Sequence, residues 1–229
     1  MYNVNIRCIL YAVNKGAGGY PLVEAKRRPL SRRRVLEAAV RFVDREGLEA
    51  LSMRKLGADL GVEAMSLYNH VPNKDALLDG MVEVLLGELE VPSGGGSWEE
   101  RVRGAYRGFR RLAREHPNVF PLLVVRPANT MDGVWLVEEF LKTLREAGFD
   151  SATALYAFRT LSGYSMGYAM AEIRGFAMEP GGDRAGARSL PADEFPHIAE
   201  LEGQLGEVDR DAEFEFGLDL ILGGLREKR

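Results

Sequence analysis

The chain has 229 residues, of which 46% are hydrophobic and 28% charged, a composition typical of a globular protein with one or two domains. Its single cysteine, Cys8, excludes an internal disulfide and a Cys-x-x-Cys metal or redox site, which favours a reducing, cytoplasmic location. No apolar run approaches the roughly 20 residues that a membrane-spanning helix needs.

The net charge of −4 conceals a difference between two parts of the chain. Residues 1–74 carry 13 Lys and Arg against seven Asp and Glu, a net charge of +6, whereas residues 75–229 carry 17 against 27, a net charge of −10. A basic first third indicates contact with a polyanion. A basic surface that is merely solvated would give the same count.

The N-terminal region combines an extension with a first helix. Residues 1–28 are expected to form a disordered extension rather than a signal peptide, because their apolar patch is short and their N-terminal charge is weak. The basic run Lys26–Arg34 leads into a helix that begins after Ser31 and ends at Gly47. The apolar residues of that helix recur at helical spacing: Val35, Ala38, Ala39, Phe42 and Val43.

Two short helical segments follow. The first begins after Ser52, Gly61 ends it, and the second is only about two turns long. Two short helices joined by a tight turn that contains glycine predict a helix-turn-helix, in which Gly61 takes a positive φ. The second short helix would then lie in the DNA major groove. Such a turn also occurs in other all-α proteins, so the basic residues in front of it add weight to the DNA-binding interpretation.

The rest of the chain predicts further helices. Asn73 caps a fourth helix, and the Gly-rich segment Val91–Ser97 follows it as the clearest break in the chain. Ser97 and Glu100 form a capping box for the next helix. Further helices are expected up to Glu115, at Thr130–Ala147, Asp150–Met178, Ile198–Leu205 and Asp211–Glu227, with a loop at Glu179–Pro196.

These elements predict an all-α fold, because no strand-like alternation is longer than four residues. The expected organisation is a disordered extension (1–28), a helix-turn-helix DNA-binding domain (29–74), a connecting helix (75–90) and a ligand-binding and dimerisation domain (97–229).

The segment LSMRKLGADLGVEAMSLYNHVPNKDALLDGM, residues 51–81, resembles the DNA-binding domain of the TetR family of bacterial transcriptional repressors. The resemblance implies a homodimer that an effector releases from double-stranded operator DNA. By matched position, the residues expected to contact DNA are Ser52, Arg54, Ser66, Tyr68, His70 and Lys74. The chain departs from the tetracycline repressors of the family at the base-reading positions Ala64, Met65 and Asn69, so its operator should differ.

The C-terminal part resembles the sensor domain of the tetracycline repressors, in the segments SWEERV, RP, GFDSATALYA and FEFGLDLILGGL. Phe109, Arg126 and Pro127 match drug-site positions. Leu122 stands where those proteins have a metal-binding histidine, and a hard cation finds no ligand in leucine. The other polar drug contacts become Ala105 and Glu138, and the glutamate that orients the metal-bound water falls near Ala171, with Glu172 adjacent. Neither a metal site nor another cofactor is therefore expected.

The other residues at and near the drug-site positions predict an apolar, aromatic-rich pocket with Arg126 and Glu138 as polar anchors. The candidate lining residues are Trp98, Phe109, Leu112, Phe120, Leu122, Trp135, Phe158, Tyr164, Tyr168 and Met170. Most of these side chains would also serve as core in any helical domain.

Two apolar stripes predict the dimer interface. They comprise Phe158, Met166 and Ile173 on the long helix from Asp150, and Phe214, Leu218, Ile221, Leu222 and Leu225 on the last helix. Two such helices from each subunit would form a four-helix interface.

No enzymatic activity is expected, because the sequence has no HExxH, GxSxG, Walker or GxGxxG pattern. The sequence therefore predicts a repressor that binds a palindromic operator as a homodimer and is released by a small apolar or aromatic effector. The alternatives are a transcriptional activator or a constitutive DNA-binding protein of the same fold.

Overall fold

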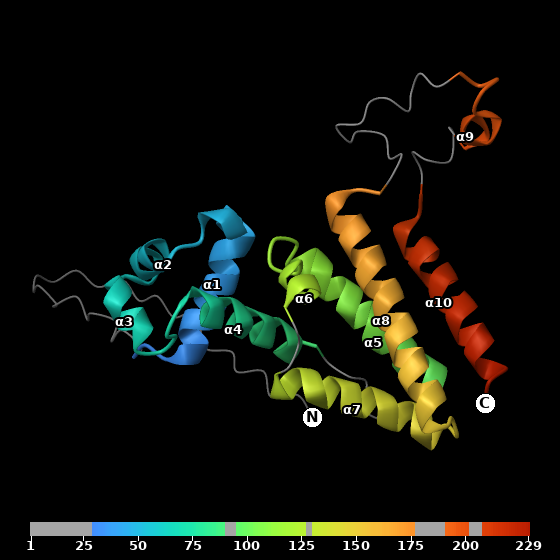
Figure 1. Ribbon diagram of the computed structural model, residues 1–229, viewed down its shortest axis with the longest axis horizontal. Coiled ribbons are helices and arrows are strands. Elements are labelled where there is room, and N and C mark those ends of the chain that lie inside the picture. The colour runs from blue at the N-terminus through green and yellow to red at the C-terminus, as the bar shows by residue number, and fades with distance from the viewer. Residues whose placement is uncertain (1–28, 90–94, 127–129, 177–190, 202–207) are drawn as a thin grey trace, which may run out of the picture. The chain divides into compact units, whose positions relative to one another are not determined.

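The computed structural model describes residues 29–89, 95–126, 130–176, 191–201 and 208–229 of a chain that divides into the units Met1–Leu30 and Ser31–Arg229. The expected disordered extension, residues 1–28, lies outside the described residues. Within the described ranges the regular structure is helical and contains no strand, which confirms the all-α prediction (Figure 1). None of the described helices is long and apolar enough to cross a membrane.

The N-terminal part of the second unit contains α1 (Arg32–Glu46), a 3-10 turn (Leu48–Ala50), α2 (Met53–Leu60), α3 (Ala64–Tyr68) and α4 (Lys74–Gly87). Helix α1 packs against α2 and α4 and buries its apolar face between them. Local sequence sets the helix starts, as predicted. The Ser31 hydroxyl accepts a hydrogen bond from the Arg34 N–H, and the Asn73 side chain accepts one from the Ala76 N–H.

The turn between α2 and α3 depends on two glycines. Gly61 ends α2 in the left-handed conformation, at φ 68° and ψ 34°, which costs glycine little. Gly57 is buried where α2 meets α3, and a Cβ there would lie 2.9 Å from the Val62 carbonyl oxygen. The two short helices are therefore held together by close backbone contact, and the predicted helix-turn-helix is present.

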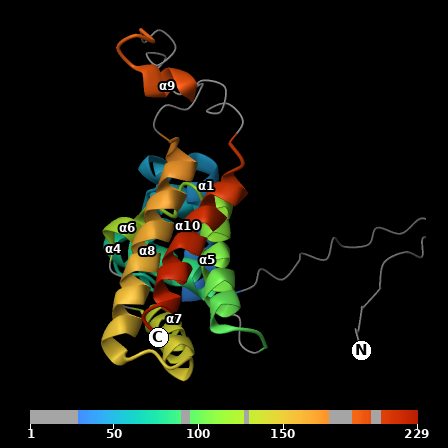
Figure 2. The same cartoon turned by 90° about the vertical axis from the view of Figure 1, so that its right-hand side faces the viewer.

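The C-terminal part contains α5 (Trp98–Glu115), α6 (Leu122–Val125), α7 (Met131–Glu146), α8 (Ser151–Arg174), α9 (Pro196–Glu200) and α10 (Arg210–Arg226). The capping box of Ser97 and Glu100 is formed at the start of α5. Figure 2 shows α5, α8 and α10 alongside one another, and α8 contacts both of the other helices. Their aromatic and aliphatic side chains form one core, which includes Trp98, Tyr106, Phe140, Phe149, Leu161, Tyr168, Phe214 and Leu218.

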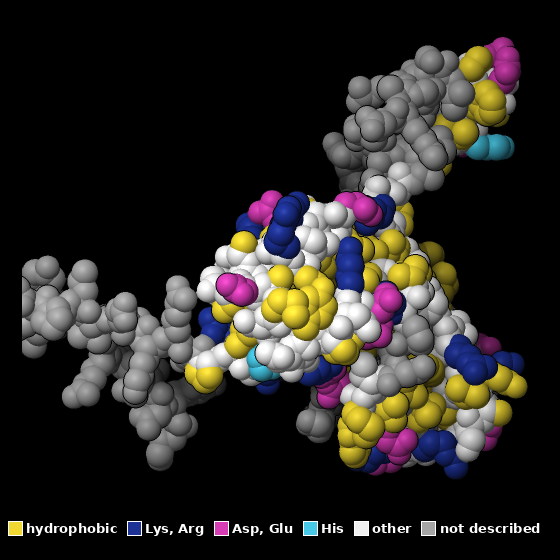
Figure 3. Space-filling model, turned by 60° about the vertical axis from the view of Figure 1, so that its left-hand side comes forward, with side chains coloured by type: hydrophobic (Ala, Val, Ile, Leu, Met, Phe, Trp, Pro, Cys, Tyr) yellow, Lys and Arg dark blue, Asp and Glu magenta, His cyan; other side chains and the backbone are white. Residues whose placement is uncertain are grey.

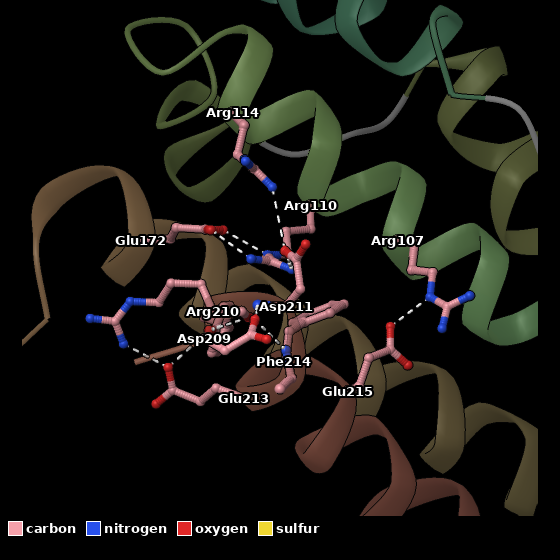
Figure 4. A network of polar contacts seen from close by, with 12 residues as sticks. Arg107, Arg110, Arg114, Glu172, Asp209, Arg210, Asp211, Glu213, Phe214 and Glu215 are labelled. Carbon is pink, nitrogen blue, oxygen red and sulfur yellow. Dashed lines mark hydrogen bonds and ion pairs between the residues drawn. The ribbon is translucent and has the colours of Figure 1, made fainter. Parts of the chain in front are cut away.

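A buried ion pair joins α5 to α8 within this core. The Arg110 guanidinium binds the Glu172 carboxylate through two hydrogen bonds of 2.7 Å, and it lies 5.0 Å from the Phe214 ring centre. The hydrogen bonds to Glu172 raise the Arg110 pKa further above its ordinary value. Asp211 and Glu215 of α10 also pair with arginines of α5 (Figure 4). Helix α5 thus holds α8 and α10 by charge as well as by apolar contact.

The structure corrects the predicted dimer stripe on α10. Phe214, Leu218 and Leu222 are at most 1% exposed, because this face of α10 packs into the core of its own chain. Ile221 and Leu225 are half-buried and pack against the same core. The apolar side chains that α10 exposes are instead Phe216 (65%) and Leu220 (63%).

Helix ends differ slightly from the expected ones. Helix α8 ends at Arg174, and the remainder of its predicted range from residue 177 onward lies outside the described residues. Helix α9 begins at Pro196, two residues before the expected start, since proline is favoured in the first turn of a helix.

Candidate functional site

The first candidate site is the exposed side of the helix-turn-helix. Leu67 is fully buried and anchors α3, whereas Met65 is 71% exposed and Tyr68 42% exposed. Asn69 is exposed as well, and Ala64 is half-buried. On the face shown in Figure 3, hydrophobic and basic side chains both reach the surface. Large apolar side chains that point to solvent from a short helix favour an interaction surface over a structural role.

Polar groups flank α3 on both sides. Ser52 caps α2, where its hydroxyl accepts a hydrogen bond from the Lys55 N–H. Lys74 is the first residue of α4, and a cationic residue at a helix start with free N–H groups suits a phosphate. Among the described residues, neither Arg54 nor Lys74 has an acidic partner, so both charges are available to DNA. Ser66 and His70, also expected at DNA, are half-buried.

The second candidate site is a cavity of about 240 Å³ in the C-terminal part. Its walls are mostly apolar and come from the end of α4 and from α5, α6, α7 and α8. The lining residues are Leu86, Leu89, Arg101, Val102, Ala105, Tyr106, Phe109, Leu123, Gly133, Leu136, Val137, Phe140, Thr143, Phe158, Ser162 and Met166. An apolar cavity with a few polar groups is typical of a small-molecule site.

Of the residues expected at the ligand, Ala105, Phe109 and Phe158 line the cavity. Trp98 does not, because its ring packs against Phe149 with 5.0 Å between ring centres. Tyr168 does not either, because it packs in the core and its hydroxyl donates to the Arg210 carbonyl. Phe158 was also expected in the dimer interface, as was Met166, and the side chains of both residues line the cavity.

Other expected ligand residues lie away from the cavity wall. Trp135 is 59% exposed and Glu138 is exposed on α7, because they lie on the solvent side of that helix. Leu122 is buried, and Ala171 is half-buried next to Glu172, which is engaged by Arg110. Pro127 lies outside the described residues, and Ile173, expected in the dimer interface, is half-buried.

Arg126 joins the C-terminal part to α4. Its guanidinium lies 2.9 Å from an Asp75 carboxylate oxygen and 2.5 Å from one of Asp79, and both acids belong to the first half of α4. These partners take the place of the ligand contact expected for Arg126. The residue therefore links the segment that follows α6 to the part of α4 next to Lys74.

His116 forms a second junction at the other end of α4. It ends α5, and its ring nitrogens lie 2.6 Å from an Asp44 oxygen and 2.9 Å from a Glu88 oxygen. Asp44 belongs to α1, and Glu88 follows α4. The hydrogen bond to Asp44 is the main cause that raises the His116 pKa, burial opposes it, and Glu88 adds to it. A protonated His116 thus connects α5 with both α1 and α4.

Comparison with known proteins supplies the family. A model described as "Bacterial regulatory proteins, tetR family" matches residues 35–81, and one described as "Tetracyclin repressor-like, C-terminal domain" matches residues 91–229. The chain belongs to the TetR family. It is therefore a DNA-binding transcriptional regulator of the helix-turn-helix type, as the sequence predicts.

Its relatives within the TetR family span nearly the whole chain. The HTH-type transcriptional repressor DrrR1 of Streptomyces coeruleorubidus is 33% identical over 208 residues, which cover 84% of this chain and 76% of the relative. The class A tetracycline repressor of transposon 1721 from Escherichia coli is 31% identical, with 85% and 90% covered. The crystal structure of Streptomyces coelicolor ActR in complex with actinorhodin has a TM-score of 0.73 at 33% identity and covers 87% of this chain and 98% of ActR.

Several residues of the cavity in this TetR-family chain escape the sequence analysis. Arg101, Ala105 and Phe109 follow one another at intervals of four on α5, so helical spacing alone would have placed Arg101 on the same face as the two predicted residues. Leu86 and Leu89 come from the connecting helix and its end, which the sequence analysis left outside the ligand-binding domain.

Lys74→Ala is expected to weaken operator binding and to lower the salt-dependence slope of the logarithm of the association constant by about one, because Lys74 is assigned to a phosphate. Tyr68→Ala is expected to weaken binding with the slope unchanged, since tyrosine carries no charge. Fluorescence anisotropy at several salt concentrations measures both effects. Lys142→Ala on α7, whose lysine is exposed, is the matched control. A Lys74→Ala slope equal to that of the wild type would remove the phosphate assignment.

His116→Gln is expected to change how the free energy of unfolding depends on pH. The folded-state pKa of His116 is raised, so its stabilising contribution is full below about pH 6.5 and is lost as the pH rises through the folded-state pKa. A neutral ring can donate to only one of the two carboxylates. The stability difference between wild type and variant should therefore be largest at low pH and shrink at higher pH. Urea unfolding across this range tests it, with His197→Gln, an exposed histidine, as control. A pH-independent difference would contradict the prediction.

Proposed function

We propose that this TetR-family chain is a transcriptional repressor that binds a palindromic operator as a homodimer and leaves it when a small apolar or aromatic effector enters the cavity. One observation carries the proposal. Leu86 of α4 and Leu89 just beyond it line the cavity, and the opposite end of the same helix bears Lys74 beside the helix-turn-helix. An effector would therefore touch the helix that positions the DNA-binding side chains.

The mechanism requires an effector that prefers one of two positions of α4, because a ligand with equal affinity for both would shift nothing. Helix α4 packs against α1 on one side and against α6 and α7 on the other. Displacement of Leu86 or of Leu123 on α6 would move the end of α4 relative to α5. The movement would change the spacing of the two α3 helices in a dimer. Moving a two-state equilibrium from 1:99 to 99:1 needs about 5.5 kcal/mol of differential affinity.

Named relatives support the regulatory direction. DrrR1 is named a repressor, and ActR binds actinorhodin in its crystal structure. Both are 33% identical to this chain. For this chain we infer the same type of response, with an effector of its own.

The expected effector needs no metal ion. Leu122, at the position of the metal-binding histidine in the tetracycline repressors, is buried and offers no ligand atom to a hard cation. The cavity walls are chiefly apolar, which suits an organic molecule held by apolar contact.

The exposed faces of α8 and α10 are the proposed dimer interface. Tyr156 of α8 and Phe216 and Leu220 of α10 are each at least 63% exposed. Gly163 and Gly167 of α8 have open space where a side chain would stand, so a partner helix could approach closely. Two helices from each subunit would form a four-helix interface with the same patch on both sides. In such a dimer two α3 helices would read half-sites about one helical turn apart.

Ala105→Trp is expected to keep operator binding and to weaken release, because the indole would fill the cavity next to Phe109. The experiment first screens a library of aromatic compounds in the absence of magnesium. It selects those that raise the melting temperature of the wild type and release it from a fluorescent operator. The variant should then need at least about tenfold more compound. Ala152→Trp, at an exposed position of α8, is the control and should respond like the wild type. Release by tetracycline only in the presence of magnesium would contradict the proposal.

Leu220→Asp is expected to give a monomer at micromolar concentration with lost operator binding, because a carboxylate without a partner would be buried in the dimer. Val134→Asp, at a residue of α7 with 54% exposure, should remain dimeric. Light scattering measures the mass of both variants. A monomeric wild type, or a dimeric Leu220→Asp variant, would exclude this interface.

A further inference from the structure

Arg101 is the only charged residue among the described residues that line the cavity. It belongs to the first turn of α5, and its side chain is only 18% exposed. Its Nη1 lies 3.4 Å from a carboxylate oxygen of Glu146, whose own side chain is 55% exposed. The Nε atom of Arg101 is buried and has no hydrogen-bond acceptor among the described residues.

The other polar groups of the lining have partners. The Thr143 hydroxyl donates to the Glu139 carbonyl oxygen over 2.8 Å, and the Tyr106 hydroxyl lies 3.0 Å from the Ser162 hydroxyl. Burial raises the pKa of Tyr106, so the phenol stays neutral. The Nε–H group of Arg101 thus differs from them, because a buried donor without an acceptor costs free energy unless a ligand supplies the acceptor.

A guanidinium offers two parallel N–H groups, and their geometry matches the two oxygens of a carboxylate. A buried guanidinium with this geometry favours a flat anionic group over a neutral one beside Arg101.

Away from Arg101 the cavity wall is largely apolar. Phe109 follows Arg101 by eight residues, a distance of about 12 Å along the helix axis. Leu86, Leu89 and Leu123 also line the cavity, and none of them offers a polar side chain. A ligand that suits this lining has an anionic head at Arg101 and an apolar or aromatic body.

We propose that Arg101 selects effectors that carry a carboxylate, or a similar anionic acceptor group, on an apolar or aromatic body. The inference rests on the proposed function, because it names the chemical class of the effector for the same cavity. The carboxylate head binds α5, while the body lies against the Leu86 end of α4. Arg101 is thus a specificity residue, and the contact with α4 belongs to the apolar part of the effector.

The test uses 2-naphthoate and its neutral methyl ester, which share one ring system, and measures binding to the full-length chain by isothermal titration calorimetry. The wild type should prefer 2-naphthoate. Arg101→Met should weaken 2-naphthoate binding by roughly tenfold to a hundredfold, the usual value of a hydrogen bond to a charged group, and leave ester binding unchanged. Arg101→Lys keeps the positive charge but not the two parallel N–H groups, so it should lose less affinity for 2-naphthoate than Arg101→Met. Arg111→Met, which removes an exposed arginine of the same helix, is the matched control and should bind like the wild type.

Three results would overturn the inference. The first is equal affinity of the wild type and Arg101→Met for 2-naphthoate, and the second is an equal loss of affinity for 2-naphthoate and its ester in Arg101→Met. The third is a wild type that does not prefer 2-naphthoate over the ester, which includes a wild type that binds neither probe at millimolar concentration. If Arg101→Met does not fold by circular dichroism, the comparison of Arg101→Lys with the wild type decides. Operator binding is measured in parallel. If the wild type binds the operator and another compound releases it, but the cavity shows no preference for an anion, the proposed function is retained and only the role of Arg101 is excluded.

Discussion

The molecule depends on one packing constraint: α4 must pack against α1 of the N-terminal part and against α6 and α7 of the C-terminal part at the same time. Its residues Leu77, Met81 and Leu85 are buried, its Gly80 meets Leu36 of α1, and its end reaches the cavity through Leu86. Side chains in closely packed interiors leave little free space, so when a ligand displaces a side chain of the cavity wall, the neighbouring residues must move as well. The ion pairs of Arg126 and of His116 hold α4 to the C-terminal part near its start and near its end.

Local signals in the sequence locate most helices of the fold. Ser31, Asn73 and Ser97 each carry a side-chain oxygen at a helix start, and such caps depend on only three or four consecutive residues. The resemblance to the TetR family adds Ala105 and Phe109, because aligned positions keep their place in the fold. The partners of His116 carry no comparable signal. Asp44 is 72 residues away in the chain, so only the tertiary fold brings the two together.

The errors have a common origin in apolar stripes. Helix α10 has apolar residues on two sides, and periodicity alone does not say which side the chain buries itself and which side it leaves exposed. The same difficulty applies to Trp98 and Tyr168, whose aromatic rings would suit a pocket but pack in the core. Arg101 differs, because helical spacing puts it on the face of Ala105 and Phe109, but a charged residue on a helix is usually solvated. Its contact with Glu146 of α7 depends on the tertiary fold, which no local pattern predicts.

The close contact of Gly57 with α3 has a consequence for how such a regulator can diversify. The backbones of α2 and α3 lie so close at Gly57 that a tilt of α3 against α2 would be resisted by backbone contact. A change in the cavity is therefore expected to move the two helices together and to leave the shape of α3 unchanged. Substitutions at Met65 or Asn69 can in turn redirect the choice of DNA site without any effect on the cavity. Recognition of an effector and recognition of a DNA sequence are therefore separable traits, and a lineage can exchange one while it retains the other.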